Sequence, residues 1–397
     1  MKPRWAFGLT FVGAVLVAGG IFYGLVLLLD FKEIDSTAKL DAKTLFDLVK
    51  LSFGVVAGAG ALVALVVAYR RQRVDEAGAH REATRLHTER FSQAVDKLGS
   101  DSPAVRLGGV HALAGLADDA PDDNQRQTCV DVLCAYLQLP HTPDPGNDPA
   151  DQEEHHRYLA FRKVRHTILR LISSHYRHPQ GTHRSWQGCD LDLVGVIIDA
   201  DMDFSGASFS GGVVDFSGAS FSGGVVDFSG ASFSGGAVDF SRATFSSGVV
   251  DFSGASFSGG AVDFSRATFS SGLMDFSYVA FSGGAVMFSD AAFCGGGVHF
   301  GDAVFSGSGV SFGGATFSDG AVSFGGATFS DGAVSFGGAT FSDGAVDFGG
   351  ATFSGGALYF SGAMGPAPAG LLDLVSVPPS GSAGSVALPA HWTSPRP

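Results

Sequence analysis

Residues 214–225 read VDFSGASFSGGV, and this twelve-residue pattern returns with small changes up to residue 363. Phe stands at positions 204, 216, 228 and every twelfth residue to 360, and a second Phe series runs from 209 to 353 at the same period. The two series hold 27 of the chain's 35 Phe residues. An α-helix cannot keep this register, and each interior Gly would cost about 1 kcal/mol relative to Ala. The period predicts a solenoid in which each Phe stacks on its copy in the next turn.

The repeat is built from five-residue units, because residues 214–218 (VDFSG) are followed by 219–223 (ASFSG), and the pattern resumes at 226. This resembles the pentapeptide-repeat family, whose unit is a small residue, a variable or acidic one, a central Leu or Phe, a small polar residue and Gly. The resemblance covers some 170 residues. It implies a right-handed, four-sided β-helix in which the central residue and the residue two before it point inward. The core ladder is then expected to include Phe204, Phe209, Phe216, Phe221, Phe228 and Phe233.

The departure from the family pattern is a two-residue spacer after every second unit, such as Gly224 and Val225. Four faces then need 24 residues per coil, and 27 central Phe residues predict nearly seven coils. We expect a rectangular section with bulged or widened corners at the Gly-Gly pairs. Residues 191–198 are expected to form degenerate entry turns, with Trp186 shielding that end.

The repeat is strongly acidic, because residues 201–363 hold 14 Asp, no Glu, no Lys and two Arg, which leaves −12 of the chain's formal charge of −14 there. Such a surface argues against direct binding to nucleic-acid phosphates. Asp precedes the first-series Phe in seven consecutive repeats and should point outward, because its neighbours point inward. These residues form a candidate interaction surface: Asp203, Asp215, Asp227, Asp239, Asp251, Asp263 and Asp275.

Three functions compete for the acidic surface. Calcium binding is disfavoured, because the repeat lacks the GGxGxDxUx nonapeptide of calcium-binding β-helices. The resemblance also implies an alternative, mimicry of DNA toward a type II topoisomerase, as in some pentapeptide-repeat proteins. The third is a general recognition surface for proteins. Ser recurs beside Phe without an accompanying base, and no phosphate-binding or nucleophile motif occurs, so we expect no enzyme, cofactor or bound metal.

Two apolar segments precede the repeat, at about 5–29 and 47–69, and each is long enough to cross a bilayer as a helix. Lys2 and Arg4 precede the first segment, and Arg70, Arg71 and Arg73 follow the second. This charge distribution predicts a multi-pass protein of the inner cell membrane with both termini in the cytoplasm. Gly pairs four residues apart in both segments are compatible with a homo-oligomer, or reflect only the abundance of Gly.

Residues 74–187 are expected to form a helical connector. Its apolar stripes are Val105, Gly109, Ala112 and Leu116; Cys129, Val130, Leu133, Tyr136 and Leu137; and Phe161, Val164, Ile168 and Ile172. Six histidines gather between 155 and 183, but Arg165, Arg170 and Arg177 among them are typical of a solvated face rather than a metal site. The basic stretch is suited to anionic lipid or to the acidic repeat. The four Cys lack paired spacing and are expected to be free thiols.

The sequence as a whole predicts four parts. Residues 1–73 form a membrane anchor, 74–187 the helical connector, 188–363 the β-helix, and 364–397 a Pro/Ala/Gly-rich disordered tail. An alternative for part of the tail is that Leu371, Leu372, Leu374 and Val375 fold over the open edge of the solenoid as a cap. The fold class is an α + β solenoid. We expect a non-enzymatic bacterial scaffold or protein-protein interaction module that is anchored in the lipid bilayer, faces the cytoplasm and holds an unknown protein partner.

Overall fold

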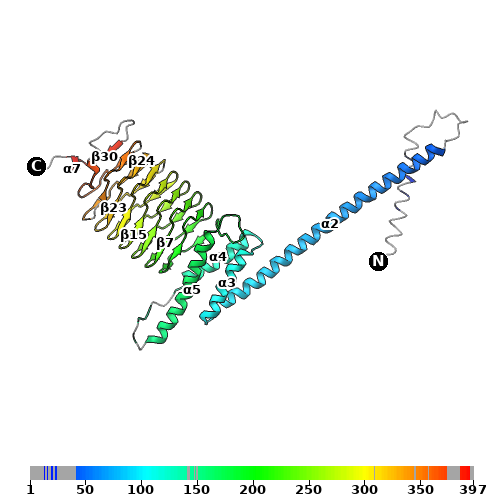
Figure 1. The fold of residues 1–397 in the computed structure, drawn as a ribbon, viewed down its shortest axis with the longest axis horizontal. Helices are drawn as coiled ribbons and strands as arrows, with labels where there is room; N and C mark the ends of the chain where they lie inside the picture. The colour runs from blue at the N-terminus through cyan, green and yellow to red at the C-terminus, as the bar shows by residue number, and fades with distance from the viewer. Residues whose placement is uncertain are drawn as a thin grey trace. The chain divides into compact units, whose positions relative to one another are not determined.

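The structure, a computed structural model, describes residues 13, 16, 19, 20, 23, 24, 42–140, 144–146, 148, 151–307, 309–343, 346–355, 357–372 and 385–393. The chain divides into two compact units, Met1–Arg85 and Leu86–Pro397. Helices precede a long β-solenoid, as the sequence predicts (Figure 1). The helices are α2 (Ala42–Leu98), α3 (Pro103–Asp118), α4 (Asp123–Gln138), α5 (Gln152–Tyr176) and α7 (Ala390–Thr393).

Helix α2 is the one described helix that is long and apolar enough to cross a membrane. The expected span 47–69 falls within it, whereas the expected span 5–29 lies outside the described residues except for six positions. Leu62, Val63 and Leu65 of α2 are more than 60% exposed. The expected boundary between residues 73 and 74 falls inside this helix, because α2 continues to Leu98.

The second unit begins with the end of α2, and three further helices, α3, α4 and α5, follow around an apolar core. Helix α3 starts at Pro103, a residue suited to the first helical position because it has no N–H to satisfy. Gly109 lets α3 approach α2 closely, since a Cβ there would lie 2.7 Å from the Leu98 nitrogen. The three predicted stripes are largely buried, but Val105 is 42% exposed, and Phe161 and Tyr136 are only partly buried.

Four parallel sheets form the sides of the solenoid, as a four-sided coil requires. The first sheet contains β1 (Leu191–Asp192), β5 (Val214–Asp215), β9 (Val238–Asp239), β13 (Val262–Asp263), β17 (Ala285–Met287), β21 (Gly309–Ser311), β25 (Ala333–Ser335), β29 (Ala357–Tyr359) and β30 (Ser385–Ala387). The second contains β2 (Ile197–Ile198), β6 (Ser220–Phe221), β10 (Thr244–Phe245), β14 (Thr268–Phe269), β18 (Ala292–Phe293), β22 (Thr316–Phe317) and β26 (Thr340–Phe341).

The other two sheets have seven strands each. The third contains β3 (Met202–Asp203), β7 (Val225–Asp227), β11 (Val249–Asp251), β15 (Leu273–Asp275), β19 (Gly297–His299), β23 (Ala321–Ser323) and β27 (Val346–Asp347). The fourth contains β4 (Ser208–Phe209), β8 (Ser232–Phe233), β12 (Ser256–Phe257), β16 (Ala280–Phe281), β20 (Val304–Ser306), β24 (Thr328–Asp331) and β28 (Thr352–Phe353).

Each turn takes 24 residues after the first, as shown by partners such as Phe245 and Phe269. The first turn takes 23, because Leu191 pairs with Val214. The ladders do not bulge regularly at the spacers. Among the described strand pairs the register shifts only between Phe305 and Ser306. The spacer residue Gly224 lies in a turn, whereas Val225 extends β7 and pairs with Val249 of β11. The first sheet contains eight solenoid strands besides β30, whereas the count of Phe residues predicted nearly seven coils. The difference arises because Leu and Ile replace Phe in part of the first turn, which the Phe count therefore leaves out.

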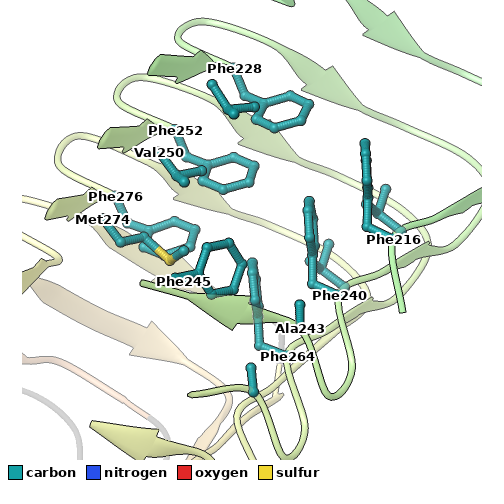
Figure 2. Packing of buried hydrophobic residues seen from close by; sticks show 14 of the residues in the cluster. Phe216, Phe228, Phe240, Ala243, Phe245, Val250, Phe252, Phe264, Met274 and Phe276 are labelled. Carbon is teal, nitrogen blue, oxygen red and sulfur yellow. The ribbon is translucent and has the colours of Figure 1, made fainter. Parts of the chain in front are cut away.

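The solenoid interior is filled by columns of Phe. Figure 2 shows two of them, Phe216, Phe240 and Phe264 in one and Phe228, Phe252 and Phe276 in the other. Rings within a column lie nearly parallel at 4.5–5.1 Å between centroids, as for Phe228 and Phe252 at 4.8 Å and 4°. Rings of the two columns in Figure 2 meet edge to face, with Phe240 and Phe252 at 6.0 Å and 90°. The six expected ladder residues are 0–3% exposed, and the small residue two before each central Phe is buried too.

Both ends of the Phe columns are covered. At the start, the ring of Tyr176 lies 6.2 Å from Phe204 and 5.3 Å from Phe209, whereas the expected shield, Trp186, stacks on His175 at 4.1 Å. At the other end Trp392 packs 5.3 Å from Phe360. This cap departs from the disordered tail expected over 364–397. Its described parts, 364–372 and 385–393, pack on the last rings of the columns and pair with the last strands, and Leu371 is fully buried there.

Candidate interaction surface of the solenoid

The predicted acidic residues form two columns on different sides of the solenoid. One column, on the first sheet, consists of Asp192, Asp215, Asp239 and Asp263. The other, on the third sheet, consists of Asp203, Asp227, Asp251 and Asp275. The first column ends where Met287 replaces Asp, and the second where His299 does. The acidic columns therefore occupy the part of the solenoid that follows the helices.

Each of the seven predicted Asp residues also has a local structural role that the repeat pattern does not reveal. One carboxylate oxygen, Oδ1, accepts a hydrogen bond from the backbone N–H two residues on, at 2.6–3.0 Å in all seven predicted residues. This is the turn-forming bond that short polar side chains make with their own backbone. Ser does the same in later turns, where the Ser323 hydroxyl oxygen accepts from Gly325 at 3.2 Å.

The acidic side chains remain available to a partner despite these bonds. All seven are partly exposed, and a carboxylate has a second oxygen that can accept further hydrogen bonds. Like charges then recur at the strand spacing of about 4.8 Å along each column. Water and salt screen such a column, but repulsion between its members still costs stability. Since Ser satisfies the same turn, the carboxylates add charge that the fold does not require.

Replacing Asp227 by Ala should lower the free energy of unfolding by about 1 kcal/mol, because the N–H of Ser229, now bonded at 2.7 Å, loses its acceptor. Replacing it by Ser should cost clearly less, since Ser fills the same position in β21, β23 and β25. Urea unfolding followed by circular dichroism measures both. Equal losses for the two variants would show that the side-chain hydrogen bond is unimportant.

The helices of the second unit pack on the first turn through paired polar groups. Arg162 of α5 donates to Asp199 at 2.6 Å, and His166 lies 2.9 Å from the other oxygen of that carboxylate. Arg177 forms an ion pair with Asp203 at 2.6 Å. Gln138 of α4 donates to the Asp192 carboxylate at 2.6 Å. Part of the basic stretch therefore lies against the acidic repeat, which is one of the two alternatives that the sequence left open.

Ionisation of Asp199 is strongly favoured in this junction. Burial opposes the charged form, but the hydrogen bonds and charges of His166 and Arg162 outweigh it and hold the pKa of Asp199 well below its usual range. A depressed folded-state pKa means that this stabilisation is fully present above the unfolded pKa of about 4 and is lost as the pH falls below it.

We therefore expect the unfolding midpoint in urea to fall as the pH drops below about 4. The variant Asp199→Asn should be less stable at neutral pH and should lack this part of the acid dependence. Urea midpoints measured across the pH range for both chains test the prediction. An unchanged pH dependence in the variant would contradict it.

Two histidines of the connector, His155 and His175, have separate environments. His155 lies 2.8 Å from Asp144, and His175 is buried between Trp186 and Asp118. Within the described part of the chain, no group of three or more His, Cys, Asp or Glu is placed to hold a metal ion. The expectation that Arg165 lies on a solvated face is wrong. Arg165 is only 7% exposed and donates to the Leu137 carbonyl at 2.7 Å. The four Cys are free thiols, of which Cys294 is exposed.

These features define a repeat protein, a capped β-solenoid preceded by helices. Residues 204–256 match the family model described as pentapeptide repeats (9 copies). This part of the solenoid is therefore built of pentapeptide repeats. No curated protein matches the chain. The fold and the family together indicate a protein-interaction or scaffold module.

Proposed function

We propose that this chain is a membrane-anchored, non-enzymatic scaffold that presents the acidic columns of its solenoid to a protein partner in the cytoplasm. The observation that carries the proposal is the pair of carboxylate columns on a rigid, capped rod. Stacked turns fix the spacing of these groups before binding, so little conformational entropy is lost when a partner docks. Pentapeptide-repeat solenoids are generally non-enzymatic, which agrees with this role.

Membrane anchoring is supported by the apolar part of α2. Several of its large apolar side chains, including Leu62 and Val63, are more than 60% exposed, a costly arrangement in water but a favourable one in a bilayer. Basic residues 70, 71 and 73 follow directly, and such residues favour the cytoplasmic side. Together with the apolar segment at 5–29, this supports a two-span anchor with both termini in the cytoplasm.

The orientation is testable through the one exposed thiol of the four, Cys294. In intact cells a membrane-impermeant maleimide should leave the full-length chain unlabelled, and labelling should appear after lysis. A chain with Cys294→Ser gives the background from the three buried thiols. A matched control with Cys at Ser36, in the loop that the sequence predicts outside the cytoplasm, should react in intact cells. Labelling of Cys294 in intact cells would contradict the proposed orientation.

The scaffold role is tested by photo-crosslinking from two equivalent positions of the third sheet. Val249 precedes Asp251 in β11, and Ala321 precedes Ser323 in β23. A photoreactive residue at 249 in the full-length chain should give a discrete protein adduct in cells, and the same residue at 321 should give much less. Adducts of equal yield at both positions, or none at 249, would contradict recognition through the acidic columns.

A further inference from the structure

A cavity of about 360 Å³ lies between helices α3, α4 and α5 and the first turn of the solenoid. Its size is that of a small-molecule site, which in proteins measures about 300–1,000 Å³. Its walls contain four Arg, two Tyr and a Phe, together with apolar residues and two carboxylates. The charged and aromatic members are Arg106, Arg157, Arg162, Arg165, Tyr136, Tyr158, Phe161, Glu154 and Asp199.

The cavity carries excess positive charge in a chain whose formal charge is −14. Among the described residues, Arg162 is the one Arg of the cavity wall that forms an ion pair with a carboxylate of that wall, Asp199. Arg106 donates to the Ser100 carbonyl and, at 2.9 Å, to the Tyr136 hydroxyl. Arg165 donates to two backbone carbonyls, and its burial lowers its pKa against the opposing charge of Asp199. Two guanidinium groups are thus held in place by neutral acceptors.

The aromatic side chains give the cavity flat, rigid walls. The guanidinium of Arg106 lies over Phe161 at 4.5 Å and over Tyr136 at 5.8 Å from the ring centroids. These contacts fix both the charge and the rings before any ligand arrives. A planar guanidinium group can bind two oxygens of one carboxylate or phosphate at once. Aromatic walls favour a ligand in which a planar ring is attached to that anion.

We propose that this cavity binds a small organic anion in which a phosphate or carboxylate is attached to a planar ring. The bound molecule would touch three helices and Asp199 of the first turn, and would therefore stiffen the junction between the helices and the solenoid. This site is separate from the acidic columns and does not depend on the proposed scaffold role.

The test is calorimetric titration of the full-length chain in detergent with AMP and with 4-hydroxybenzoate, which represent the two anions. Adenosine supplies the ring without the charge, and inorganic phosphate the charge without the ring. We expect saturable binding of AMP, 4-hydroxybenzoate or both, and at least tenfold weaker binding of adenosine and of inorganic phosphate. Removing one charge-assisted bond should weaken affinity by about tenfold or more.

The variant for this test is Arg157→Gln, because Arg157 is mostly exposed and has only a long ion pair to Glu153, at 3.6 Å, so its loss should leave the fold intact. Its matched control is Arg170→Gln, an exposed residue of the same helix outside the cavity wall. Arg157→Gln should weaken binding and Arg170→Gln should not. The proposal is overturned if neither anion binds saturably, if adenosine binds as tightly as AMP, or if the two variants behave alike.

Discussion

Replacing Phe252 by Ala is expected to lower the free energy of unfolding by about 3–5 kcal/mol, a typical cost for deleting a buried ring. Phe252 is fully buried and lies between Phe228 and Phe276, each 4.8 Å away and nearly parallel to it. Its edge-to-face neighbours belong to the opposite column. The neighbouring turns hold the column in position, so the site cannot collapse to fill the space that the ring leaves.

Urea unfolding of the full-length chain, followed by circular dichroism, measures this loss. Phe252→Leu should cost distinctly less, because Leu keeps much of the apolar volume. The outward neighbour supplies a second control, since Asp251→Ser should change stability little. If Phe252→Ala cost no more than Asp251→Ser, the Phe columns would not be the source of the solenoid's stability.

Replacing Gly260 by Ala is expected to cost about 2–5 kcal/mol, from left-handed strain and steric overlap together. Gly260 has φ +88°, and a Cβ there would overlap the carbonyl oxygen of Gly236 in the turn before. The two-residue spacer thus brings successive corners into backbone contact. Every equivalent position from 212 to 296 is Gly, as this contact requires.

Gly254 is the matched control in the same turn. It also has positive φ, +65°, but a Cβ there meets nothing within 4 Å. Arg242 and Tyr278 occupy equivalent corners at φ 60° and 59°. Gly254→Ala should therefore cost only about 1–2 kcal/mol. Unfolding midpoints for the two variants compare them directly, and equal losses would mean that the close contact at Gly260 is unimportant.

The solenoid was predictable because one period repeats along some 170 residues. A side chain with a fixed place in every turn must stack on its copies, so the buried Phe positions and the outward Asp positions follow from the sequence alone. The entry turn was also visible in part, but its exact length was not. One residue fewer in the first turn is a local adjustment that leaves no repeated signal.

Features that depend on one contact between distant segments could not be predicted in this way. Arg165 looked solvated because its sequence neighbours are basic, yet α4 and the first turn bury it. The cavity beside it is assembled from three helices and one turn. The tail looked disordered by composition, with Leu371 as a candidate cap, whereas the packing of Trp392 on the open end of the solenoid left no signal in the sequence. The hydrogen bond between each predicted Asp carboxylate and the backbone N–H two residues on could not be predicted, because it depends on the backbone geometry of the turn.

The most direct test of the 24-residue coil is disulfide formation between introduced cysteines. Ser232 pairs with Ser256 in the next turn, and Ser256 pairs with Ala280 in the turn after that. Neighbouring strands lie about 4.8 Å apart, within reach of a disulfide, and second neighbours do not. In a Cys294→Ser background, oxidation should join cysteines at 232 and 256 and leave cysteines at 232 and 280 free. A disulfide between 232 and 280, or none between 232 and 256, would contradict the stacked coil.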